Sequence, residues 1–164
     1  MVKSSLKSDT GFVIAFFEEG EAKNDITISK KGTYVKIIDF NNLPNGLLGI
    51  SVKSEYKVSI KDICQLEDGL NIAEVEAMID PEVDDQAILA EYPEFVSILT
   101  QIMKHPKVNE MSIDVNFNSA DSIAYHLGGL IPLTSQEKQS LLEAFDASQR
   151  CVILSKCIER MTGS

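Results

Sequence analysis

The sequence predicts an α+β protein in which an antiparallel β meander is followed by a helical bundle. Between residues 32 and 78, apolar residues alternate with polar ones, which is typical of strands with one face on a core. The breaks include Asn45-Gly46 and Asp68-Gly69, dipeptides that accept the positive φ of tight hairpin turns. After Asp80 the apolar spacing changes to three and four residues, which is typical of amphipathic helices. We therefore expect a boundary near Asp80, with a β lobe over residues 1–80 and a helical lobe over residues 81–164.

Length and composition agree with a small globular protein. The 164 residues suffice for one domain or two small lobes. No apolar run approaches the roughly 18 residues of a membrane span, and Met1–Lys7 is not followed by the apolar block of a secretory signal.

Cys64, Cys151 and Cys157 are odd in number and lack metal-binding spacing. We interpret all three as reduced thiols of a cytoplasmic protein, with Cys151 in the core.

The charge is negative and unevenly spread. With 15 basic and 25 acidic residues the formal net charge is −10, and residues 62–94 contain 11 acidic residues but no Lys or Arg. Such a field repels phosphate backbones and argues against nucleic acid as a partner. Lys30, Lys31 and Lys36 form a small basic cluster that is insufficient to predict RNA binding. The simplest reading of the acidic stretch is a solvated face.

The β lobe is predicted element by element. Val2 and Leu6 are four residues apart, which suggests the end of a helix over residues 1–7. Phe12–Phe17 is a short apolar strand, and the polar residues 22–31 are expected to form a loop. The meander then comprises strands over residues 32–39, 47–52, 56–61 and 70–78.

The first helices are marked by caps and by an apolar stripe. Asp84 or Asp85 is placed to cap a helix start after Pro81. Pro93 either kinks one helix or begins a second at its first position. The stripe ends near His105 and contains Ile88, Leu89, Tyr92, Phe95, Val96, Leu99, Ile102 and Met103.

The last helices are predicted from three more capping signals, after residues 107–118, whose pattern is ambiguous. Ser119 begins a helix that we expect to end at Gly128-Gly129, and Thr134 to Glu137 is a capping box that opens a helix through Phe145. The same pattern at residues 146–149 opens a final helix through about residue 161. Its predicted buried stripe is Cys151, Val152, Leu154, Ile158 and Met161.

Three segments together resemble one family. The first contains Gly32, Thr33, Val35, Ile37 and Asp39, then Leu43 and Gly46-Leu47-Leu48-Gly49-Ile50 with Val52. The second is Asp68-Gly69-Leu70 with Ala73-Glu74-Val75-Glu76. The third contains Ala124, Leu130-Ile131-Pro132-Leu133, Glu137-Lys138-Gln139, Leu141-Leu142-Glu143, Asp146 and Arg150, and it is the most specific. They resemble the N-terminal, substrate-binding domain of Lon proteases, a domain that also occurs as a stand-alone bacterial protein, over most of residues 11–161.

The resemblance implies a fold and a role. The fold would be a β pseudo-barrel, related to the RNA-binding PUA fold, with a helical bundle after it. The role would be to grip unfolded or tagged polypeptides for degradation or quality control, without catalysis, since ATPase and protease activities belong to separate domains. The family opens with strands of the Leu-Pro-Leu-Phe-Pro-Leu and Leu-Pro-Leu-Arg-Ile-Phe-Glu types, whereas Met1-Val2 here resembles the end of the helix that follows them. We therefore expect a truncated reading frame with unpaired strand edges, stabilised by association with another copy.

No catalytic, cofactor or metal site is predicted. The sequence contains no P-loop motif and no pair of histidines at zinc-binding spacing; His105 and His126 lie apart, each near a predicted helix end. A Ser-x-x-Lys spacing occurs at residues 4–7, 54–57 and 135–138, but none has the helical, pocketed context of a Ser-Lys nucleophile. Glu74 and Glu76 share a strand face, most simply a solvated one.

Apolar side chains near the predicted strands and turns are the candidates for polypeptide binding. Phe16 and Phe17 are adjacent, so they point to opposite sides of a strand, and Leu43 and Leu47 flank the Asn45-Gly46 turn. The competing interpretation is that all four are core. An extended polypeptide could also add to a free sheet edge through its main chain. The rival functions are an RNA-binding module and a hydrolase that the sequence does not reveal.

Overall fold

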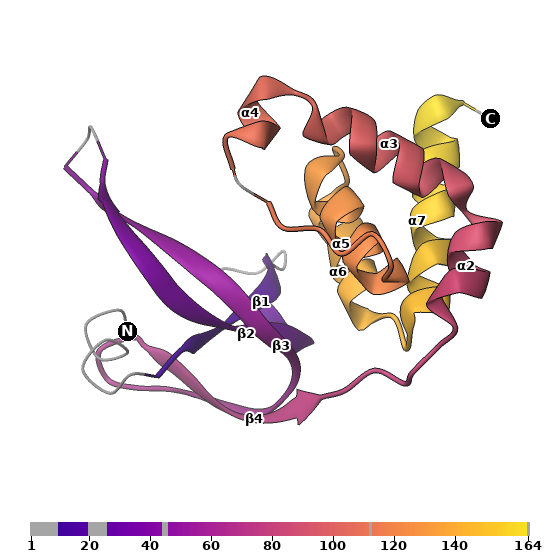
Figure 1. Ribbon diagram of the computed structural model, residues 1–164. Coiled ribbons are helices and arrows are strands. Elements are labelled where there is room, and N and C mark those ends of the chain that lie inside the picture. Colours follow the sequence, from indigo (N-terminus) through magenta and orange to yellow (C-terminus); the bar gives the residue numbers. More distant parts are fainter. Residues whose placement is uncertain (1–9, 20–25, 44–45, 112, 164) are drawn as a thin grey trace. The chain divides into compact units, whose positions relative to one another are not determined.

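The structure, a computed structural model, describes residues 10–19, 26–43, 46–111 and 113–163. It divides into two compact units, Met1–Ile79 and Asp80–Ser164. The helix end expected at residues 1–7, including Ser4 and Lys7, lies outside the described residues, as does Asn45. The order of elements, strands first and helices after, is the predicted α+β arrangement (Figure 1).

The first unit is a four-stranded antiparallel meander, as predicted. Its strands are β1 (Phe12–Glu19), β2 (Ile26–Asn42), β3 (Leu48–Gln65) and β4 (Asn71–Met78). They pair in chain order, β1-β2-β3-β4. Within the described residues, β1 and β4 are therefore the two edges of the sheet.

Two hairpin loops of the same kind join β2 to β3 and β3 to β4. Each has the sequence Leu, two further residues, Gly, Leu, and the glycine has positive φ, 78° at Gly46 and 81° at Gly69. In both loops the glycine N–H donates to the carbonyl of the first leucine at 2.9 Å. This is the three-residue hairpin that needs a residue in the left-handed region, so both predicted turns are confirmed.

Two strand predictions are wrong in extent. Residues 53–55 do not separate two strands, because β3 is continuous and absorbs Glu55 as an extra residue where the register shifts from Tyr34↔Tyr56 to Val35↔Ser54. A bulge of this kind bends a strand without ending it. Residues 26–31 are part of β2 and not a loop, because residues 26–28 pair with residues 17–19 of the edge strand β1.

The long strands β2 and β3 extend beyond their neighbours (Figure 1). β1 pairs only as far as Val35, and β4 pairs with β3 only from Lys57 onward. Residues 36–42 and 48–56 consequently form a two-stranded section, which we call the ribbon. A two-stranded hairpin is marginally stable in water by itself.

The second unit contains six helices within the described residues. These are α2 (Asp85–Glu91), α3 (Pro93–Met103), α4 (Pro106–Asn109), α5 (Ala120–Leu130), α6 (Ser135–Glu143) and α7 (Ala147–Thr162). Its core is one apolar cluster, whose fully buried large side chains include Phe95, Leu99, Ile123, Leu127 and Leu154.

The predicted helix starts are confirmed at atomic detail. Asp84 accepts from the N–H groups of Gln86 and Ala87 at 3.1 Å, and Pro93 begins α3 as a second helix. Thr134 and Glu137 form the complete reciprocal capping box of α6, and Asp146 accepts from the N–H of Gln149 at 2.8 Å. Each cap satisfies main-chain donors that the helix itself leaves unpaired.

The predicted end of α5 is wrong. The helix continues through Gly128-Gly129 to Leu130 and ends before Pro132, which disfavours helical geometry at the residue preceding it. Gly128 is buried, and a Cβ there would lie 2.5 Å from Cδ1 of Leu141. This glycine thus permits close packing against α6 and does not stop the helix.

The buried face of α7 is also narrower than predicted. Cys151, Leu154 and Cys157 are buried, Ile158 packs partly against the core, and Val152 and Met161 are exposed. Val152 follows Cys151 directly, so the 100° turn of the helix carries it off the apolar stripe.

A fully buried arginine joins α5, the end of α6 and α7. Arg150 pairs with Asp121 and, at 2.7 Å, with Asp80, and its Nε donates to the carbonyl of Leu141 at 2.9 Å. Its guanidinium carbon lies 4.2 Å from the ring centroid of Tyr125. A buried cation requires such partners, so this cluster is structural.

Candidate binding surface of the β unit

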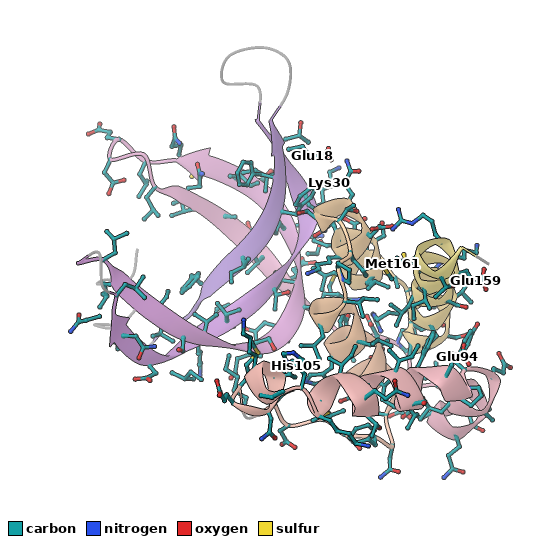
Figure 2. All side chains as sticks on the ribbon, turned by 90° about the horizontal axis from the view of Figure 1, so that it is seen from above. Glu18, Lys30, Glu94, His105, Glu159 and Met161 are labelled. Carbon is teal, nitrogen blue, oxygen red and sulfur yellow. The ribbon has the colours of Figure 1, made fainter. Side chains whose placement is uncertain are left out.

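The sheet curls around an apolar cavity of about 780 Å³. Figure 2 shows the curved sheet with side chains projecting into its concave side. Both edge strands contribute to the lining, so the two unpaired edges border the same hollow. The cavity is lined by Thr10, Gly11, Phe12, Val13, Ala15, Phe17, Ile28, Tyr34, Ile60, Ile63, Gly69, Leu70, Asn71, Ile72, Ala73 and Val75.

The start of β1 is held tightly against the sheet. The N–H of Gly11 donates to the Tyr34 hydroxyl at 2.6 Å, and Tyr34 stacks on Tyr56 with centroids 4.9 Å apart. A Cβ on Gly11 would lie 2.1 Å from the carbonyl oxygen of Val35, so no larger residue fits without moving the main chain. The β1 wall of the cavity is therefore fixed at this end.

The four sequence-predicted binding residues fall on different surfaces. Phe17 is 54% exposed and lines the cavity, whereas Phe16 is half-buried and does not contribute to that lining. Leu43 and Leu47, 43% and 62% exposed, flank the hairpin loop of the ribbon. The interpretation of Phe17, Leu43 and Leu47 as core is therefore wrong. Phe17 pairs with Ile28 near the start of β2, whereas Leu43 follows the far end of that strand, so the structure does not bring the four together.

Two groups of exposed apolar residues were missed from the sequence. One is on the cavity wall, at Ile63 and Ile72, and the other is on the ribbon, at Ile38, Phe40 and Leu48. Period-two alternation identified which residues share a face, but alternation does not report whether anything covers that face. Ile38 is the extra residue of a bulge, which breaks the alternation altogether.

The edge at β4 is acidic on one face. Ala73 and Val75 line the cavity and pair with the lining residues Ile63 and Ile60 of β3, so Glu74 and Glu76, one residue out of phase, lie on the other face of β4. Ile72, at the start of the strand, has the parity of the glutamates but also reaches the cavity rim. Glu76 pairs with Lys61 of β3 at 3.1 Å. On the other side of the sheet, Glu18 of the edge strand β1 and Lys30 of its neighbour β2 lie toward the same end of the two strands (Figure 2).

The described residues offer little for chemistry. None of their His, Cys, Asp and Glu side chains gather in groups of three that could hold a metal ion. All three cysteines are free, and burial raises the pKa of the Cys151 thiol to about 11, which disfavours the reactive thiolate. His126 Nδ1 lies 2.6 Å from the carbonyl of Ser122 within its own helix, and His105 precedes α4.

No helix in the described part of the chain has the length and apolar character to cross a membrane.

The family of the chain is shown by a match along almost its whole length. A family model for the substrate-binding domain of ATP-dependent protease La (LON) matches residues 1–160. The chain belongs to this family. The resemblance seen in the three sequence segments is thereby confirmed, and within these 164 residues the match is to the substrate-binding domain and not to an ATPase or protease domain.

Similar proteins support the family assignment. The Lon protease of Buchnera aphidicola subsp. Schizaphis graminum (strain Sg) is 28% identical over 167 residues, which cover 96% of this chain and 21% of that protein. The Lon protease of Heliobacterium modesticaldum is 25% identical over 136 residues, 79% of this chain and 16% of that protein. The Lon substrate-binding domain described here therefore spans about a fifth of the Lon proteases it matches.

Two solved structures share the fold. A Lon N-terminal domain protein from Xanthomonas campestris superposes with a TM-score of 0.65 at 20% identity, over 94% of this chain and 80% of that one. The N-terminal domain of the Mycobacterium avium complex Lon protease gives a TM-score of 0.60 at 18% identity, over 88% of each chain. At these identities the likeness establishes the fold of this Lon substrate-binding domain and nothing finer.

Proposed function

We propose that this chain is a non-catalytic domain that binds unfolded or tagged polypeptides in cytoplasmic protein degradation or quality control. The observation that carries the proposal is the exposed apolar cavity of the β unit, bordered by both edges of its sheet. The family description, a substrate-binding domain of an ATP-dependent protease, agrees with it.

The cavity suits clients that differ in sequence. An apolar surface attracts apolar side chains in proportion to the area buried, without directional demands. An edge strand adds main-chain hydrogen bonds, which every non-proline residue of an extended client can form. Most folded proteins present little of either feature, because they bury most of their apolar residues and pair most of their main-chain groups.

Substitutions on the cavity wall test the proposal. Phe17 and Ile63 are exposed cavity residues, so the Phe17→Ser, Ile63→Ser double variant removes apolar contact area at little cost in folding. We expect its affinity for a permanently unfolded, carboxymethylated polypeptide to fall by about tenfold, measured by fluorescence anisotropy. Phe145→Ser is the matched control, because Phe145 is also exposed but belongs to the helical unit. Equal loss in the control, or unchanged binding in the double variant, would contradict the proposal.

Titrating the same protein with structured RNA distinguishes polypeptide binding from the rival function, RNA binding. The β unit carries nine Lys residues and twelve Asp or Glu residues over positions 1–79, a net charge of −3. Binding to structured RNA alone, with a steep dependence on salt, would replace polypeptide binding as the function.

We also propose that a second copy can occupy the β1 edge. β1 is mostly apolar, and Ile14 is exposed on it, so two β1 edges can pair without like charges opposite each other along most of their length. Size-exclusion chromatography with light scattering tests this. If the protein stays monomeric at millimolar concentration, two β1 edges do not pair, and the β1 edge would be available to polypeptide clients alone.

A further inference from the structure

We propose that the β4 edge selects extended segments in which apolar residues alternate with Lys or Arg. The inference rests on the proposed polypeptide-binding function and specifies which clients this edge prefers. It concerns β4, the cavity beside it and the two carboxylates on its other face.

The register of an added strand fixes which residues meet. When an extended segment pairs with β4, its side chains alternate between the two faces of the sheet, and residues directly opposite each other share a face. Residues facing Ala73 and Val75 then point toward the cavity, where apolar side chains are favoured. Residues facing Glu74 and Glu76 lie on the opposite face, about 5 Å from a carboxylate-bearing residue.

The charge around this edge is unbalanced. Between positions 62 and 79 the chain has five carboxylates and no Lys or Arg. Glu76 has Lys61 as a partner on β3, whereas no cation among the described residues lies within salt-bridge distance of Glu74. A Lys or Arg on an incoming strand would supply the missing positive charge, and a Glu or Asp there would be repelled.

A second copy is a poor occupant of this edge. Two antiparallel β4 strands paired about Val75, the register with the longest overlap of the β4 glutamates, would set Glu74 of each copy opposite Glu76 of the other. The simplest alternative is that the two glutamates only protect the edge from aggregation, a common use of charge on edge strands. That alternative predicts no preference between basic and acidic clients, so the two readings can be separated.

The test uses three nine-residue peptides with Val at the odd positions and Lys, Ser or Glu at the even positions. We expect the Lys peptide to bind the full chain about tenfold more tightly than the Glu peptide at low salt, with the Ser peptide between them. The difference should shrink in 0.5 M salt, since the carboxylates are exposed. A Lys peptide with N-methyl groups on alternate residues should bind weakly, because it cannot complete the main-chain ladder.

Charge reversal on the protein provides the matched control. The Glu74→Lys, Glu76→Lys variant should invert the order of the Lys and Glu peptides. The Glu82→Lys, Glu110→Lys variant changes the net charge equally, at exposed positions of the helical unit, and should preserve the original order.

Three outcomes would overturn the inference. They are equal binding of the Lys and Glu peptides, inversion of their order by the control variant, and unchanged binding after N-methylation. If these occur while the unfolded polypeptide still binds through Phe17 and Ile63, the selectivity fails and the proposed function stands. If no polypeptide binds at all, both fail.

Discussion

The two units treat their apolar residues in opposite ways. Of the 18 buried apolar residues among those described, three (Val35, Val58 and Ile60) belong to the β unit and 15 to the helical unit. Of the 18 exposed large apolar residues, 12 belong to the β unit and six to the helical unit. The helical unit therefore uses its apolar residues to fold, whereas the β unit leaves most of its own available to a partner.

Charged residues follow the same division. In the helical unit Arg150 is fully buried and its donors reach Asp80, Asp121 and a main-chain carbonyl. In the β unit the carboxylates of β4 are exposed at a sheet edge. The buried cation of the helical unit has all its partners within that unit, whereas of the two β4 glutamates only Glu76 has a cation at salt-bridge distance among the described residues, which is the expected difference between a scaffold and a binding surface.

Removing the buried cation gives the largest expected effect. Arg150→Met leaves Asp80 and Asp121 without their cation and should lower the free energy of unfolding by about 3–5 kcal/mol. Urea denaturation followed by far-UV circular dichroism measures it. Arg160→Met is the control, because that ion pair with Glu137 involves an exposed arginine and should contribute less than about 1 kcal/mol. Similar losses in the two variants would show that Arg150 does not organise the helical unit.

The second prediction concerns alkaline pH. Burial raises the pKa of Cys151 from its ordinary value of 9.0 to about 11, so above pH 9 the unfolded chain loses this proton before the folded one does. Stability should therefore fall as the pH rises from about 9 to 11, by up to about 2 kcal/mol. Urea midpoints at pH 8, 9.5 and 10.5 test this. Cys151→Ala should be less stable at pH 8 but should show a shallower decline, and an equal slope in both proteins would exclude Cys151 as the cause.

Adjacent glycines in α5 provide a third, signed prediction. Gly129→Ala meets no atom within 4 Å and should stabilise the helix by about 1 kcal/mol, since alanine favours helices. Gly128→Ala places a methyl group 2.5 Å from Leu141 and should destabilise by about 1 kcal/mol, because the overpacking cost exceeds that gain. Thermal unfolding midpoints should move in opposite directions. Stabilisation by both substitutions would mean that α5 and α6 have room between them.

Local signals in the sequence predicted the fold well. Asp84, Pro93, the Thr134–Glu137 box and the two glycine turns each specify their structure within a few residues of chain, so a single sequence reveals them. Where prediction failed, a distant partner decided the outcome. The Gly128-Gly129 pair is typical of a helix end, and only the packing of Leu141 against Gly128 explains why the helix continues there. Likewise, residues 53–55 resemble a break between strands, and only the pairing with β2 shows that Glu55 is a bulge in one continuous strand.

The candidate site was less accessible from sequence than the fold. Alternation placed Ala73 and Val75 on one face, but the cavity exists because the sheet curls until β1 and β4 border the same space. Curvature depends on bulges and twist summed over all four strands, and no local motif encodes it. Phe17 was a candidate because of its residue type, and the structure shows that it is exposed and lines the cavity.

The smallest expected effect is on the free energy of unfolding when exposed apolar residues of the ribbon are replaced, and it compares the two units directly. Ile38 and Leu47 are exposed on the ribbon, so Ile38→Ser and Leu47→Ser should each change the free energy of unfolding by less than about 0.5 kcal/mol. Ile123→Ser in the helical core should cost several times more, because its side chain is fully buried. Urea midpoints of the three variants measure this difference directly. A large loss in either ribbon variant would show that these residues support folding, and the β unit would then hold less apolar surface available for a partner than its exposure indicates.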